Sequence, residues 1–142
     1  MAKPESKYSE DVHLHLSFIQ GVITRMNSNS FSMKSWMVAI VSALGAIYAS
    51  NTCNPQSYVY FFIAVAAVLV FWCLDAYYLK MERQYRDLYN DVLTHTDETD
   101  FNLKADGYKQ SFWCALWSKS NWPLYLPFFL VLLGVALYLV LK

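Results

Sequence analysis

Asp75 is the residue in this sequence whose type and surroundings could do chemistry. It interrupts an uncharged apolar run in the stretch FWCLDAYYLKMERQYRDLYND (71–91), and the nearest charged residue before it is Lys34. An ionisable group in an apolar segment is costly to bury, so it marks an ion or proton path or a contact between helices. Lys34 begins the preceding apolar segment and would lie at the same depth in an antiparallel helix pair. We therefore predict an ion pair between Lys34 and Asp75, with tyrosine hydroxyls as the alternative partners of the carboxylate.

The sequence contains no pattern typical of an enzyme active site or a metal site. It contains no GxSxG, no HExxH and no glycine-rich phosphate loop. Cys53, Cys73 and Cys114 lack metal-like spacing, and His13 and His15 would point to different sides of a helix. Tyrosines near residues 77–89 are accompanied by balanced charges, and the net charge is zero. We expect no enzymatic activity, no cofactor, no metal and no direct nucleic-acid binding.

The composition indicates a membrane protein. Hydrophobic residues make up 56% of the chain and charged residues 15%, against about 45–50% and about 25% in soluble domains. Two stretches carry no charge, 35–74 and 120–141. A membrane-spanning helix needs about 20 apolar residues, so the first stretch holds two spans and the second holds one. The expected fold is an all-α integral membrane protein with three transmembrane helices, an N-terminal amphipathic helix and a cytoplasmic extension of the second span.

Hydrophobic periodicity divides the chain into four segments. Apolar residues recur at helical spacing from Tyr8 to about Met26, and Asn27 to Ser30 predict a turn before the membrane. A second apolar stripe continues from Leu74 to Val92, so we expect the second span to extend into water and to be covered there by the amphipathic helix. The predicted segments are 1–30 (cytoplasmic amphipathic helix), 31–79 (two-span hairpin), 80–119 (cytoplasmic helix, acidic loop and interfacial helix) and 120–142 (third span).

Two further patterns concern helix contacts. Small residues share one side of the first span, a pattern that lets membrane helices approach closely. We define this small-residue stripe as Ser35, Ala39, Ser42, Ala46 and Ala49. On the extension of the second span, opposite charges four residues apart predict two ion pairs, each stabilising a helix by about 0.2–0.5 kcal/mol. The pairs are Glu82 with Arg86 and Arg83 with Asp87.

The distribution of basic residues predicts the orientation. Lysines and arginines occur in the N-terminal segment and between residues 80 and 119, whereas the connection NTCNPQS (51–57) has none. Cytoplasmic loops carry the excess of Lys and Arg. We therefore expect the N-terminus and the middle segment on the cytoplasmic side of an inner membrane, and the C-terminus on the periplasmic or extracellular side.

This layout, together with the stretch LDAYYLKMERQYRDLYNDV (74–92), resembles the SLATT-like small bacterial membrane proteins of nucleotide-linked antiviral conflict systems. The resemblance covers about residues 8–93 and is one of layout; the third span departs from the simplest two-span pattern. It implies a homo-oligomeric effector that perturbs or permeabilises the membrane in abortive-infection defence. It also implies a soluble cytoplasmic sensor or nucleotide-signalling partner, and no catalytic residues.

Two other functions stay open. The chain could be a membrane anchor or regulatory subunit whose amphipathic segments dock a soluble cytoplasmic partner. It could also be a minor subunit of a transporter or respiratory assembly, where small multi-span chains without motifs occur. In all three cases membrane lipid is an expected partner.

Overall fold

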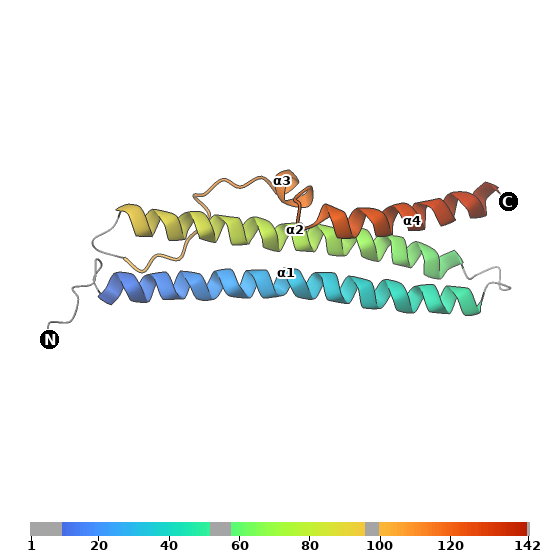
Figure 1. Ribbon diagram of the computed structural model, residues 1–142, viewed down its shortest axis with the longest axis horizontal. Coiled ribbons are helices and arrows are strands. Elements are labelled where there is room, and N and C mark those ends of the chain that lie inside the picture. The colour runs from blue at the N-terminus through green and yellow to red at the C-terminus, as the bar shows by residue number, and fades with distance from the viewer. Residues whose placement is uncertain (1–9, 52–57, 96–99, 142) are drawn as a thin grey trace.

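The computed structural model describes residues 10–51, 58–95 and 100–141, and over these residues it is helical with irregular connections and no strands. Two long helices, α1 (Glu10–Ser50) and α2 (Tyr58–His95), lie antiparallel and side by side (Figure 1). A short helix, α3 (Phe112–Leu116), leads into α4 (Trp122–Leu141), which runs beside the first half of α2. The all-α fold class is therefore confirmed.

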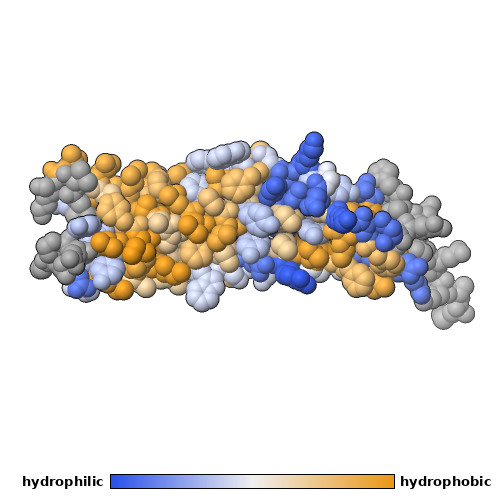
Figure 2. Space-filling view, turned by 180° about the vertical axis from the view of Figure 1, so that it is seen from behind, coloured by the Kyte–Doolittle hydropathy of each residue, from blue (hydrophilic) through white to orange (hydrophobic). Residues whose placement is uncertain are grey.

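Hydropathy divides the molecule along its length into an apolar half and a polar half (Figure 2). The apolar half comprises residues 34–50, 58–75 and 121–141, and the polar half comprises residues 10–33, 76–95 and 100–111. α1 has 41 residues and α2 has 38, so each is roughly 55–60 Å long, about twice the thickness of a bilayer core. Both are long and apolar enough to cross a membrane, and α4 adds a shorter apolar stretch over Trp122–Tyr138.

α1 is a single helix, so the turn predicted at Asn27 to Ser30 is wrong. Serine and asparagine can break a helix because their side chains compete for backbone hydrogen bonds. Here the competition stays inside the helix, since Ser32 Oγ donates to the Ser28 carbonyl at 2.9 Å and Ser35 Oγ to the Phe31 carbonyl at 3.1 Å. Ser30 is buried and contacts α2. Tertiary contact thus keeps this polar stretch helical.

The polar half has its own hydrophobic core, built mostly from one face of α1 and one face of α2. The predicted cover of the α2 extension by the N-terminal amphipathic segment is confirmed by this core. Its buried residues are Val12, Leu16, Ile19, Ile23, Leu88, Val92 and Ala105. Because these residues are apolar at helical spacing, the two helices stay paired beyond the apolar half.

Residues 105–111 form an irregular segment on α2, which we call the strap; it contains a turn in which the Tyr108 N–H donates to the Ala105 carbonyl at 3.1 Å. The interfacial helix predicted in the last part of segment 80–119 is limited to α3, Phe112–Leu116. Side chains of α2 pair with polar groups of the strap: Gln84 Nε2 donates to the Tyr108 carbonyl at 2.7 Å, and Gln110 Nε2 donates to Asp87 Oδ2 at 2.5 Å. The Tyr108 hydroxyl donates to Asp91 Oδ2 at 2.7 Å. These bonds hold the strap on α2 in a conformation that is not helical.

The strap predicts a late-titrating tyrosine. Burial, followed by the hydrogen bond to Asp91 and the negative charges of Asp91 and Asp87, raises the pKa of Tyr108 from 10.0 to about 12. Because the folded-state pKa is raised, this stabilisation is complete below pH 10 and is lost as the pH rises through 12. We expect Tyr108→Phe to remove this transition from a tyrosinate absorbance titration and to lower the free energy of unfolding by roughly 0.5–1 kcal/mol. A wild-type minus variant difference that titrates at the ordinary tyrosine pKa would contradict the assignment.

Candidate functional site

The boundary between the two halves is marked by a buried polar cluster where three parts of the chain meet. Asp75 of α2 lies against Ser30 and Lys34 of α1, and Lys34 in turn contacts Asn121, which directly precedes α4. Asp75 and Asn121 are fully buried, Ser30 is 5% exposed, and the Lys34 side chain is 19% exposed. Charged side chains are rarely buried unless paired, so the contacts of this cluster decide what it can do.

Asp75 and Lys34 form the predicted ion pair, with Lys34 Nζ 2.5 Å from Asp75 Oδ2. Ser30 Oγ donates to the other carboxylate oxygen, Asp75 Oδ1. Lys34 Nζ also donates to Ser30 Oγ at 3.0 Å and to Asn121 Oδ1 at 3.3 Å. An ammonium has three donors, and here three oxygens surround it. The cluster is therefore a closed network in which both charges are compensated.

Local sequence explains why these side chains converge. Ser30 and Lys34 are four residues apart and so occupy the same face of α1. Asn121 is held by its backbone, since its N–H donates to the Ser118 carbonyl at 2.9 Å and its own carbonyl accepts from Leu124 at 3.1 Å and Tyr125 at 3.2 Å. Its side-chain Nδ2 donates to the Ala115 carbonyl at 3.4 Å. The start of α4 thus presents Asn121 Oδ1 to Lys34.

Aromatic residues pack directly beside the cluster. Trp72, one turn before Asp75, donates from Nε1 to the Leu116 carbonyl at 3.0 Å and so holds α3 against α2. Its ring stacks on Tyr125 of α4, with centroids 6.0 Å apart and an interplanar angle of 4°. The buried Tyr125 hydroxyl lies near the Asp75 carboxylate, although it makes no hydrogen bond of acceptable geometry there. Of the two predicted kinds of partner for Asp75, the lysine forms the ion pair, whereas a tyrosine hydroxyl only lies nearby.

Of the two ion pairs predicted on the extension of α2, one is present and one is absent among the described residues. Glu82 and Arg86 pair at 2.7 Å. The predicted pair between Arg83 and Asp87 is wrong over the described part of the chain, because Asp87 faces the strap and accepts from Gln110 instead. Every member of the small-residue stripe is exposed and contributes nothing to the packing within the chain. The buried face of α1, at Met37 and Val41, lies on the opposite side of the helix.

Sequence reasoning found Lys34 and Asp75 but missed the other two members of the cluster, Ser30 and Asn121, and the neighbouring Tyr125. Ser30 was assigned to a turn, yet its spacing of four residues from Lys34 was a usable signal for a shared helix face. Asn121 carries no such signal, because its contact depends on how the α3 segment folds back onto Trp72. His15 Nε2–H donates to the Asn102 carbonyl at 3.0 Å, and the His15 ring lies tilted against the Phe101 ring, with centroids 5.7 Å apart. Within residues 10–51, 58–95 and 100–141, no three His, Cys, Asp or Glu side chains gather as a metal site would require.

The geometry favours a structural role for the cluster over an ion path. A carboxylate that is buried, paired with an ammonium and hydrogen-bonded to a hydroxyl has no oxygen directed toward solvent. An ion path would instead need a polar route that leads water to the group. The cluster ties α1, α2 and the start of α4 to one another at one level.

Comparison with known proteins adds no assignment, since no protein-family model, curated protein or solved structure matches this chain.

The ion pair can be tested by a double-mutant cycle. Asp75→Asn leaves a largely buried ammonium without its counter-charge, and Lys34→Gln leaves a buried carboxylate unpaired. Breaking a buried pair from one side costs about 3–5 kcal/mol, and partial exposure of Lys34 places the expected loss toward the lower value. The double variant should recover part of the loss, because neither charge is then orphaned. Thermal unfolding in detergent measures the stability of the two single variants and the double variant relative to the wild type. Strictly additive losses would show that the two side chains do not interact.

Proposed function

We propose that this chain is a three-span inner-membrane protein that acts as a homo-oligomeric effector and perturbs or permeabilises the membrane. The three spans are residues 34–50 of α1, residues 58–75 of α2 and α4. Their lengths support this arrangement, since 17 to 20 residues give roughly 25–30 Å of helix, the thickness of a bilayer core. The basic residues of the polar half support a cytoplasmic position for that half and for the N-terminus.

The single observation that carries the oligomeric proposal is the exposed small-residue stripe. The stripe lies in the apolar half, on the side of α1 away from α2 and α4. Hydrocarbon does not drive apolar helices together, so close backbone approach through small residues is a main source of association in lipid. A stripe that the chain leaves uncovered is therefore available to a second copy.

The continuous helices support a link between the cytoplasm and the membrane. α1 and α2 each run unbroken from the polar half into the apolar half. A displacement of the polar half would therefore be transmitted to the spans through the helix backbones, with the Lys34–Asp75 cluster at the point of transfer. The setting in antiviral defence, and a soluble sensor or nucleotide-signalling partner as the trigger, rest on the resemblance to SLATT-like proteins.

The stripe gives a direct test with a matched control. Ala39→Leu combined with Ala46→Leu enlarges two side chains that are exposed in the single chain. The fold should therefore persist while the oligomer dissociates. Ala66→Leu makes the same change at an exposed position of α2. Crosslinking in native membranes should show loss of the oligomer only in the stripe variant, and a membrane-potential dye in expressing cells should show loss of depolarisation. An unchanged oligomer in the stripe variant would refute this interface.

A second candidate function, a membrane anchor for a soluble partner, is favoured by an apolar surface on the polar half. Leu14 and Phe18 are each 47% exposed, and Phe101 is 40% exposed. Phe101 lies close to Phe18, with ring centroids 6.4 Å apart, and has a positive φ of 55°. Affinity purification distinguishes the candidates: a stoichiometric soluble protein that is lost in Phe18→Ser supports the anchor, and a particle of this chain alone supports the effector.

A further inference from the structure

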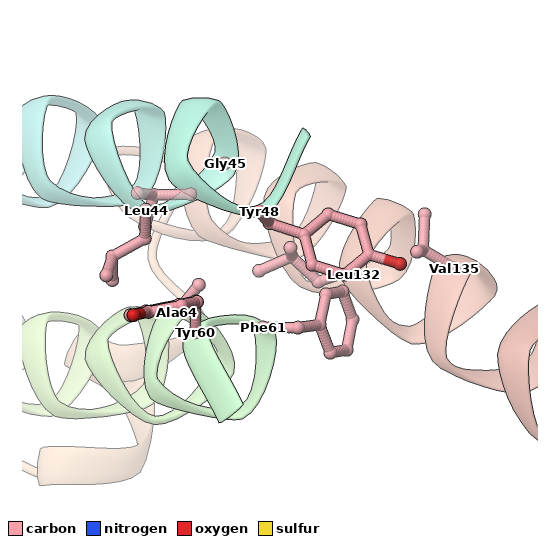
Figure 3. Close-up of a pocket in the computed structure, with 9 residues that line it drawn as sticks. Leu44, Gly45, Tyr48, Tyr60, Phe61, Ala64, Leu132 and Val135 are labelled. Atoms are coloured by element: carbon pink, nitrogen blue, oxygen red, sulfur yellow. The ribbon is translucent and has the colours of Figure 1, made fainter. Parts of the chain in front are cut away.

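A cavity of about 200 Å³ lies among α1, α2 and α4 in the apolar half, near the end where α1 finishes and α2 begins. Figure 3 shows side chains of all three helices around it, with the rings of Tyr48 and Phe61 between α1 and α4. Nine residues line the cavity: Val41, Leu44, Gly45, Tyr48, Tyr60, Phe61, Ala64, Leu132 and Val135.

Small residues create this hollow, and apolar atoms make its wall. Gly45 and Ala64 lie in adjacent helices where larger side chains would fill the space. A Cβ added to Gly45 would meet no atom within 4 Å. Phe61 and Ala64 are 5% and 2% exposed and form the inner wall, whereas Tyr60 and Val135 are 38% and 36% exposed. The hollow is therefore open to the outer surface of the apolar half.

We propose that the cavity binds a segment of one phospholipid acyl chain, an inference that rests on the three-span placement proposed above. In that placement hydrocarbon surrounds the opening. An empty hollow forfeits the dispersion contacts of its lining atoms, so a flexible apolar chain that can enter is favoured. Water is disfavoured because a buried water needs two to four polar partners, and among the lining side chains only Tyr48 and Tyr60 carry a polar group.

Size decides between an acyl chain and the other apolar occupants. Apolar cavities of about 150 Å³ accept a molecule the size of benzene, so about 200 Å³ suits a short run of methylene groups. A helix from a second copy is about 10–12 Å across with its side chains and is too wide to enter. The aromatic wall supports the same occupant: the rings of Tyr48 and Phe61, with centroids 6.1 Å apart, offer flat apolar surfaces. The tyrosine hydroxyls suit the polar end of a lipid at the membrane surface.

Photo-crosslinking with a defined lipid tests the site. The full chain is reconstituted in phosphatidylcholine vesicles that contain a phosphatidylcholine with a diazirine on one acyl chain. After illumination, mass spectrometry maps the adducts. The expected result is an excess of adducts on Leu44, Phe61 and Leu132, compared with exposed apolar residues elsewhere in the same half, such as Val70 and Val131.

Substitutions at glycine provide the matched control. Gly45→Leu should fill the hollow and remove most of these adducts. Gly134→Leu makes the same change at another helical glycine whose added Cβ also meets open space, but which does not line the cavity, so its adduct map should match the wild type. The wild-type map decides the question by itself if Gly45→Leu fails to fold.

Each other outcome overturns a specific statement. Adducts spread evenly over the exposed apolar surface, or unchanged in a folded Gly45→Leu protein, would refute the lipid site and leave the three-span placement standing. Protein-to-protein crosslinks at Phe61 or Leu132 would assign the cavity to a second copy instead. A chain that does not float with the vesicles and acquires no adducts would refute the membrane placement itself.

Discussion

The contact between Lys34 and Asp75 is the constraint on which the rest of this structure depends. An ammonium and a carboxylate lie together inside an otherwise apolar bundle, and Ser30 and Asn121 complete their hydrogen bonds. A slip of either long helix by one turn would move it about 5.4 Å and separate the charges. Apolar side chains can exchange partners at small cost, but buried charges cannot, so the pair fixes the register of α1 against α2. Asn121 extends the same constraint to α4.

With the register fixed, two different cores can form on the same pair of helices. The core of the polar half lies between α1 and α2 and is covered by Ala105 of the strap. The core of the apolar half consists of Met37, Val41, Val68 and Trp72, together with Tyr125 of α4. Trp72 connects the cluster to α3 through its hydrogen bond to the Leu116 carbonyl. A change that loosens the cluster is therefore expected to affect both ends of the molecule, which is the property that an effector with a cytoplasmic trigger would need.

Much of this fold could be predicted because residues 35–74 and 120–141 carry no charge. Lys34 and Asp75 bound a charge-free stretch, and an antiparallel hairpin places them at the same depth, so their ion pair could be predicted. The stripe from Leu74 to Val92 predicted that α2 continues beyond the apolar half. The errors came from contacts distant in sequence. Asn27 to Ser30 are helical because Ser30 bonds to Asp75. Residues 105–111 are irregular because Gln84, Asp87 and Asp91 of α2 bond to them. The small-residue stripe could be identified in the sequence, but its exposure is known only from the structure.

The most direct test of this account is the depth of the cluster in a membrane. Nitroxide labels are placed one at a time at exposed positions of α1, α2 and α4 in a cysteine-free protein in vesicles, and their accessibility to a water-soluble reagent is compared with that to oxygen. Exposed positions include Ser28, Phe31, Val38, Val70, Tyr77 and Val131. We expect accessibility to change from water to hydrocarbon at the level of Lys34 in α1, of Asp75 in α2 and of the start of α4. Labels that stay in water throughout, or three changes at unrelated depths, would contradict it.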